Sequence, residues 1–220
     1  MQNPLYNYRI RTALKALRDR VRNCRNKRKV DVQCHSRLAS GGYAMESRGE
    51  GHSLEIGAGT WMARPLIELK GSNNRLVIGK ECIIGPGCTF SLVGDNLTVI
   101  VGDGTTFTHS CELRAEESGV SINVGKDCMF SNDVRVRTSD GHPMIDLDTG
   151  KRLNPPASVS IGSHVWLTPG CRVMKGAEIG DGSIVGTYAV VTKQHPANTL
   201  IVGQPARDVK SGVSWQRKFE

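Results

Sequence analysis

Aliphatic residues recur at every sixth position along the C-terminal part of this 220-residue chain. Six consecutive hexapeptides begin with one, and five of the six carry a small residue four positions later. The leading residues are Ile161, Leu167, Val173, Ile179, Val185 and Val191. A unit this short cannot hold a helix and a turn, but it accommodates a short strand and a bend. Three such units close a triangular coil, and stacked coils bury together the apolar faces that one coil leaves open.

The same unit recurs upstream with a longer spacing. Hexapeptides with glycine in second place, spaced 22 or 23 residues apart, begin at Ile56, Ile78, Val101 and Val124. Three hexapeptides account for 18 residues of each coil, and the surplus falls in polar stretches such as 71–75, 94–96 and 116–119. We expect these stretches to bulge as turns from one corner of each coil. The predicted fold is all-β, a parallel β-helix of hexapeptide repeats over residues 36–210.

Five of the seven cysteines occupy the small inward position of the repeat, namely Cys82, Cys88, Cys111, Cys128 and Cys171. An odd number of cysteines without a CxxC pair argues against a disulfide framework and against a structural zinc site. A free cysteine packs as a small buried hydrophobe. We therefore interpret these five as packing residues.

The net charge of +8 is concentrated near the N-terminus. Residues 9–29 hold ten Lys or Arg against one acid, Asp19, which leaves the rest of the chain close to neutral. No Pro or Gly interrupts residues 5–30, and apolar residues recur there at heptad spacing, which predicts a short basic α-helix within residues 1–35. Residues 211–220 are expected to form a C-terminal tail. A near-neutral body without a nucleic-acid motif excludes a nucleic-acid binder.

The chain lacks an apolar run long enough to cross a bilayer, and no apolar stretch follows its N-terminal charges. We expect a cytoplasmic protein. The basic arm has two interpretations. It packs on the end of the β-helix and covers an open strand edge, or its cationic face meets an anionic partner, such as the inner membrane surface or an acidic polysaccharide.

The C-terminal repeats resemble the signature of the hexapeptide acyltransferases, in particular their galactoside, maltose, xenobiotic and capsule-modifying branch. The resemblance covers about residues 52–210, and its most specific motifs are Val165-Trp166, Val191-Thr192-Lys193 and Gly203-Gln204-Pro205-Ala206. It implies a left-handed β-helix, a homotrimer, acetyl-CoA as co-substrate and a site in the groove between neighbouring subunits.

A candidate active-site loop, residues 137–160, interrupts the repeat between Val136 and Ile161. Long excursions from a regular scaffold commonly carry function. This one contains His142, where the resemblance places the catalytic histidine. A neutral imidazole can take the proton of an attacking hydroxyl and return it to the departing thiolate. Asp140 or Asp146 could orient the ring.

Trp166 occupies an outward position of its repeat, where a tryptophan calls for a ligand or a subunit to cover it. We interpret it as a wall of the active site whose indole N–H reaches the thioester or the sugar. The resemblance also implies a backbone N–H that stabilises the thioester oxyanion. The aligned residue is Pro169, which has no N–H, so the expected donor is Thr168 or Gly170, unless it lies elsewhere.

The resemblance further assigns residues to acetyl-CoA. It places Thr187, Thr192 and Lys193 along the pantetheine arm. Arg207 and Lys210 are expected near the phosphates, where cations are needed.

These features predict an O-acetyltransferase that moves an acetyl group from acetyl-CoA to a sugar hydroxyl of an oligosaccharide or polysaccharide. The SDGH and RLNPP sequences of the loop are most similar to members that modify bacterial surface polysaccharides or sialic acid. Alternatives are an N-acetyltransferase of an amino sugar, a xenobiotic acetyltransferase, a β-helical carbonic anhydrase and an inactive scaffold. His109, His142 and His164 lack the spacing of the anhydrase zinc site, so no metal is predicted, and the acetyl-CoA motifs argue against a scaffold.

Overall fold

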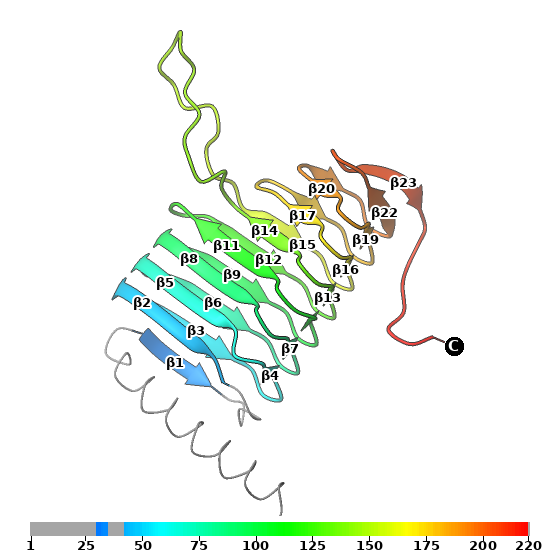
Figure 1. Cartoon of the computed structure of the whole chain (residues 1–220), viewed down its shortest axis with the longest axis horizontal. Helices are drawn as coiled ribbons and strands as arrows, with labels where there is room; N and C mark the ends of the chain where they lie inside the picture. The colour runs from blue at the N-terminus through cyan, green and yellow to red at the C-terminus, as the bar shows by residue number, and fades with distance from the viewer. Residues whose placement is uncertain (1–29, 35–41, 220) are drawn as a thin grey trace, which may run out of the picture.

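The computed structural model describes residues 30–34 and 42–219, which wind into a parallel β-helix with three sheets (Figure 1). Sheet A contains β1 (Val30–Cys34), β3 (His52–Ile56), β6 (Arg75–Ile78), β9 (Thr98–Val101), β12 (Ser121–Val124), β15 (Val159–Ile161), β18 (Glu178–Ile179) and β21 (Gln194–His195). Sheet B contains β2 (Ala44–Glu50), β5 (Leu66–Ser72), β8 (Thr89–Asp95), β11 (Glu112–Glu116), β14 (Arg135–Arg137), β17 (Arg172–Val173) and β20 (Val190–Val191). Sheet C contains β4 (Trp61–Met62), β7 (Ile83–Ile84), β10 (Thr106–Phe107), β13 (Met129–Phe130), β16 (Trp166–Leu167), β19 (Ile184–Val185), β22 (Thr199–Val202) and β23 (Arg207–Ser211).

The inward positions follow the hexapeptide pattern. All six leading aliphatics from Ile161 to Val191 are at most 3% exposed, and the five inward cysteines are at most 1% exposed. Each coil places its inward apolar residue in register with the equivalent residue of the next coil, as in the pair Phe107 and Phe130. The predicted β-helix and the packing role of the cysteines are confirmed, because burying these stacked rows is what holds the coils together.

The surplus residues of the upstream coils partly lengthen the strands of sheet B, so the expected turns are confined to the shorter stretches 73–74, 96–97 and 117–119. β5 and β8 have seven residues each, whereas β17 and β20 have two. Gly71 pairs with Gly94 at the end of these longer strands. Asn74 closes the following turn, since its amide donates to the carbonyls of Lys70 and Gly94 and accepts from the N–H of Leu97.

The β-helix begins earlier than the expected boundary at residue 36. β1 pairs in parallel with β3, and Val30 is buried, so residues 30–34 belong to sheet A and not to a helical arm. The basic helix predicted upstream of them lies outside the described residues. Among the described residues, no helix is long and apolar enough to span a bilayer.

The C-terminal end is closed by β23, which pairs antiparallel with β22. The chain then returns along the corner between sheets A and C. Trp215 is buried there, and the Arg217 guanidinium donates to the carbonyls of Gly104 and Cys128. The predicted C-terminal tail is therefore packed along the preceding coils.

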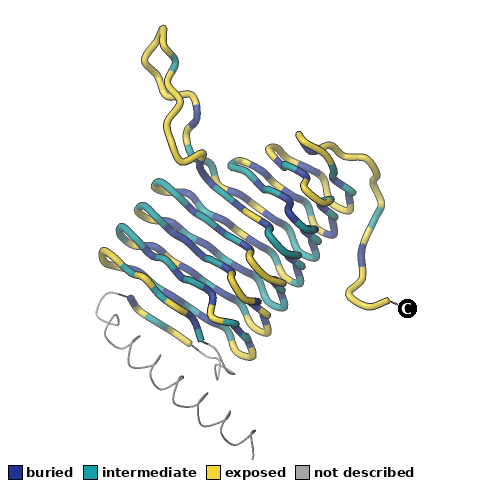
Figure 2. Tube along the Cα trace, viewed as in Figure 1, coloured by how far each residue is buried: buried dark blue, intermediate teal, exposed yellow. Residues whose placement is uncertain are grey.

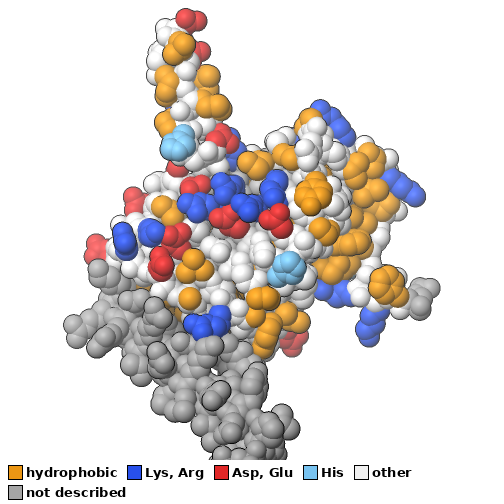
Figure 3. Space-filling model, in the orientation of Figure 1, with side chains coloured by type: hydrophobic (Ala, Val, Ile, Leu, Met, Phe, Trp, Pro, Cys, Tyr) orange, Lys and Arg blue, Asp and Glu red, His pale blue; other side chains and the backbone are white. Residues whose placement is uncertain are grey.

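Each sheet presents a different outer surface. Sheet A carries mainly polar residues, among them Ser53, Thr98 and Ser121. Sheet B carries ion pairs, among them Arg114–Glu116, Arg137–Glu112 and Arg172–Asp133. Basic and acidic side chains lie intermixed below the projecting loop (Figure 3). Sheet C is the apolar face, with aligned side chains at Trp61, Ile83, Thr106, Met129, Trp166, Ile184 and Leu200.

Candidate active site

The candidate loop leaves the β-helix between β14 and β15, at the corner between sheets B and A, and projects well beyond the coils (Figure 1). Most of its residues are exposed (Figure 2). Ser139 and Arg152, on its two arms, both bind Glu117 of the preceding coil. Glu117 accepts from both terminal nitrogens of Arg152, at 2.5 and 2.8 Å, and from Ser139 Oγ at 2.6 Å. The Arg152 and Ser139 bonds lower the pKa of Glu117 to about 2.

Asp140 lies at the base of the loop and is tied to the body of the β-helix. Its Oδ2 is 2.7 Å from Lys175 Nζ and 2.8 Å from Asn154 Nδ2. These two bonds lower the pKa of the Asp140 carboxyl. Among the described residues, Asp140 makes no hydrogen bond to the ring of His142, so its contacts position the loop. Asp146 lies at the tip, where its carboxylate accepts from the N–H and hydroxyl of Thr149.

His142 is exposed, and its backbone is held while its ring is accessible. Its carbonyl accepts from Asn154 Nδ2 at 2.9 Å. Within the described part of the chain, the imidazole has no hydrogen-bond partner. A general base of this kind must reach a substrate hydroxyl directly, and an exposed ring on a fixed backbone meets that requirement.

Trp166 lies on the outer surface of sheet C, between Met129 and Ile184 of the adjacent coils. Its indole Nε1–H donates to Ser131 Oγ at 3.2 Å. Its ring is 6.3 Å from that of Trp215, at an interplanar angle of 48°. The expected donation from the indole to a substrate would therefore compete with the bond to Ser131.

The backbone donors expected for the oxyanion are engaged within the chain. The N–H of Thr168 donates to the carbonyl of Val185 at 3.0 Å, and that of Gly170 donates to the carbonyl of Asn132 at 3.0 Å. These are bonds between successive coils, and breaking one would cost about 1 kcal/mol. The structure therefore favours a donor elsewhere, which the sequence left open.

The residues expected to bind acetyl-CoA are exposed along the C-terminal coils. Thr187 lies in the turn after β19, with its hydroxyl 3.4 Å from that of Thr168. Thr192 and Lys193 follow β20, at the corner between sheets B and A. Arg207 and Lys210 lie on β23.

The predicted site residues fall into two groups within one chain. The corner between sheets B and A carries His142, Asp140, Thr192 and Lys193. Sheet C and its corner with sheet B carry Trp166, Thr168, Gly170 and Thr187. One chain thus presents the two groups at different corners of the triangular coil.

Several neighbours of these groups carry no sequence signal. No role was predicted for Asn154, although it belongs to the RLNPP sequence, or for Lys175 and Trp215, because their roles depend on where the loop and the tail fold back. His164 binds Asp127 at 2.7 Å and the carbonyl of Trp215 at 3.1 Å. Across residues 30–34 and 42–219, no three His, Cys, Asp or Glu side chains lie close enough together to hold a metal ion.

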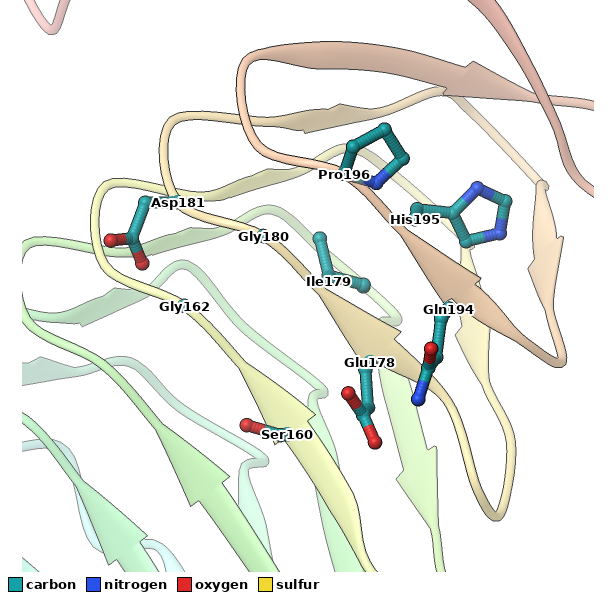
Figure 4. Close-up of a pocket in the computed structure, with 9 residues that line it drawn as sticks. All are labelled: Ser160, Gly162, Glu178, Ile179, Gly180, Asp181, Gln194, His195 and Pro196. Atoms are coloured by element: carbon teal, nitrogen blue, oxygen red, sulfur yellow. The ribbon is translucent and has the colours of Figure 1, made fainter.

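A hollow lies on the outer surface of sheet A near the C-terminal end (Figure 4). It is lined by Ser160, Glu178, Gln194 and the turns that follow their strands. None of the predicted catalytic or acetyl-CoA residues lines it. It therefore does not replace the loop as the candidate site.

Comparison with known proteins finds similar acetyltransferases. The bacterial transferase hexapeptide family (six repeats) matches residues 158–193. A polysialic acid O-acetyltransferase of Neisseria meningitidis is 29% identical over 200 residues, which cover 81% of this chain and 92% of that protein. The crystal structure of the polysialic acid O-acetyltransferase OatWY has a TM-score of 0.73 at 28% identity, covering 87% of this chain and 92% of that one. The chain is thus similar to hexapeptide-repeat acetyltransferases along most of its length.

The chain also matches part of a longer relative. The polysialic acid O-acetyltransferase of Escherichia coli O1:K1 / APEC is 34% identical over 119 residues, which are 54% of this chain and 38% of that protein. The likeness to OatWY extends over most of the coils, so the fold of the chain is the left-handed parallel β-helix that the family resemblance implied.

Proposed function

We propose that the protein transfers the acetyl group of acetyl-CoA to a sugar hydroxyl of a bacterial surface polysaccharide, with a sialic acid polymer as the first acceptor to test. The observation that carries the proposal is the match to the Neisseria enzyme along 92% of that protein. It is supported by a loop that presents an accessible histidine at one corner of the β-helix.

His142 acts as the general base in this proposal. Its neutral imidazole accepts the proton of the sugar hydroxyl while the oxygen attacks the thioester carbon. The C–S bond then breaks, and the imidazolium returns the proton to the departing thiolate of coenzyme A. The sugar oxygen has gained the acetyl group, and the histidine ends in its starting form.

The site is completed by a second copy of the chain. The two groups of site residues lie at different corners, and a neighbouring copy would bring Trp166 and Thr187 of one chain beside His142 of the next. Sheet C supports such assembly, because its outward row is apolar apart from Thr106, and Ile83 in that row is 49% exposed. An apolar row on an outer surface is typical of a subunit contact. We propose a homotrimer with equivalent sites between subunits.

The loop supports the same arrangement. Hydrophobic side chains gather along it (Figure 3), and Met144, Ile145, Leu147 and Leu153 are 49–98% exposed. Among the described residues, none of these four side chains belongs to the buried hydrophobic core. A neighbouring subunit would cover them and enclose the reacting groups.

Acetyl-CoA binds along the C-terminal coils in this proposal. Thr187, Thr192 and Lys193 contact the pantetheine arm, and Arg207 and Lys210 contact the phosphates. Both cations lie exposed on β23, where a phosphate can reach them. Charge-assisted bonds to phosphate oxygens are the strong ones, so these residues contribute most to binding of the nucleotide end.

The decisive experiment is transfer from labelled acetyl-CoA to a panel of oligosaccharides and polysaccharides, including sialic acid polymers and neutral polymers. The full-length protein is expected to label a sialic acid polymer, and His142→Ala is expected to lower kcat by ~10²–10⁴ without loss of the trimer. Labelling confined to free amino sugars would replace the proposal with N-acetylation. Near-native turnover by His142→Ala would remove the histidine from the mechanism.

We further propose that the protein acts in the cytoplasm, with the basic arm of residues 9–29 recruiting it to the inner membrane surface. Cations near an anionic surface each contribute about 1 kcal/mol at most. Removal of residues 1–29 tests this. The truncated trimer should lose binding to vesicles that contain anionic lipid and keep its turnover on soluble acceptor. Equal binding of both forms at physiological salt would contradict recruitment.

A further inference from the structure

Asn154 is a buried polar residue on the returning arm of an exposed loop. It is 3% exposed, whereas its neighbours Leu153 and Pro155 are exposed. The residue lies twelve positions after His142, so the contact between them is made by the fold and not by the local sequence. A buried amide in such a place must have its hydrogen bonds satisfied, which makes its partners informative.

The side chain of Asn154 holds the backbone on both sides of Pro143. Its Nδ2 donates to the carbonyl of His142 at 2.9 Å. Its Oδ1 accepts from the N–H of Met144 at 2.6 Å. Pro143 between them has no N–H and a restricted backbone. The Asn154 amide therefore fixes the peptide groups before and after the proline. It thereby fixes the position of the His142 backbone that carries the imidazole.

The same amide connects this turn to the body of the β-helix. Asn154 Nδ2 also donates to Asp140 Oδ2 at 2.8 Å. Asp140 in turn binds Lys175 Nζ at 2.7 Å, and Lys175 donates to the carbonyl of Pro155 at 3.1 Å. Successive contacts therefore connect Lys175 of the stacked coils, through Asp140 and Asn154, to the peptide groups around His142.

We propose that Asn154 is a positioning residue for the acetyl transfer, which holds His142 in place through its backbone. The inference rests on the proposed role of His142 as the base. A general base must lie within hydrogen-bond reach of the hydroxyl that it deprotonates. Displacement of about 1 Å can lower a rate by about 10²-fold. Asn154 acts on the reaction only through His142, because its own polar atoms are buried and occupied.

The test compares steady-state kinetics of Asn154→Ala, His142→Ala and the double variant, with the trimeric full-length protein. Asn154→Ala is expected to lower kcat by ~10–100-fold and to leave the KM for acetyl-CoA unchanged. Asn154→Asp keeps the acceptor for Met144 but loses both donated bonds and repels Asp140, so a similar loss is expected. Thr149→Ala, which releases a hydrogen bond at the loop tip, is the matched control and should retain native kcat.

The double variant separates positioning from general structural support. If Asn154 works through His142, adding Asn154→Ala to His142→Ala should lower the residual rate no further. Independent losses that multiply in the double variant would overturn the inference. So would native kcat in Asn154→Ala. Loss of activity in His142→Ala supports the proposed function whatever Asn154→Ala does. Failure of the Asn154 inference is therefore distinguishable from failure of the proposed function.

A measurement without turnover checks the same contact. Hydrogen exchange of the Met144 amide should be slow in the native protein and faster by about tenfold or more in Asn154→Ala, because its acceptor is gone. Exchange in the stacked strands, for example at Val136, should be unchanged. An unchanged Met144 amide would show that Asn154 does not hold this turn.

Discussion

The ring of Trp215 lies flat against the ring of His164, with centroids 4.3 Å apart and planes 6° apart. Two hydrogen bonds join the same residues. The indole N–H of Trp215 donates to the carbonyl of His164 at 2.8 Å, and His164 Nε2 lies 3.1 Å from the carbonyl of Trp215. Arg217 extends the contact by binding Asp127, which also binds His164. The tail is thereby fastened beside Trp166, at the candidate site.

Replacement of Trp215 tests whether this contact holds the tail. Trp215→Ala removes the stacked ring and one donor, and is expected to lower the free energy of unfolding by about 1–3 kcal/mol. Trp215→Phe keeps an aromatic face and should lose less. Thermal unfolding and limited proteolysis of the tail measure the effect. Equal stability of the native protein and Trp215→Ala would show that the tail is not fastened by this ring.

The anchor at Glu117 predicts that the loop loosens in acid. The Arg152 and Ser139 bonds depress the pKa of Glu117 from 4.5 to about 2, so the folded loop favours the carboxylate. This stabilisation is complete above pH 4.5 and is lost as the pH falls towards 2. Proteolytic cleavage of the loop by an acid protease should increase over that interval. Glu117→Gln should be cleaved readily throughout it, and a flat native profile would refute the anchor.

The sequence predicted the fold well because one period repeats through it. An aliphatic residue at each sixth position leaves few alternatives to a stacked coil, and inward cysteines fit the same pattern. The lengthened strands of sheet B were missed, since polar residues such as Gly71 and Ser72 suggest turns. The register with the coil above, as in Gly71 with Gly94, stabilises them as strands.

Motifs in the sequence single out candidate site residues, but contacts between distant segments have no such signal. The loop and the repeat single out His142 and Trp166, whose roles in the reaction stay predictions. Asp140 was expected to orient the ring of His142, but its carboxylate binds Lys175 of the next coil instead. Asn154 and Trp215 reach their partners only after the loop and the tail fold back, which no local spacing encodes.

The exposed cations of the C-terminal coils predict a defect specific to acetyl-CoA. Lys193→Ala, Arg207→Ala and Lys210→Ala should each raise the KM for acetyl-CoA by roughly 10-fold, as expected for one charge-assisted hydrogen bond. The KM for the sugar should change little. Lys80→Ala, an exposed lysine of an upstream coil, is the control. An increase confined to the sugar KM would refute the placement of acetyl-CoA.

The apolar surface of sheet C predicts where subunits meet. Ile83 lies in the outward row of sheet C, and Ile100 points outward from sheet A. Ile83→Glu should dissociate the trimer in sedimentation, because a charge would be buried in the contact. Activity should fall with it, although Ile83 lies three strands from Trp166 in the sheet. Ile100→Glu should remain trimeric. The opposite pattern would move the contact to sheet A.

A site shared between chains also predicts that two inactive variants restore each other. His142→Ala and Trp166→Ala each damage every site in a trimer of identical chains. When the two are mixed, dissociated and reassembled, some interfaces combine His142 of one chain with Trp166 of its neighbour. Random assembly of equal amounts makes about one quarter of the sites intact, so activity should recover to about that fraction of native. Mixing without dissociation is the control and should give no recovery. If His142 and Trp166 of the same chain formed one site, no mixture could recover activity, because each chain would still lack one of the two residues.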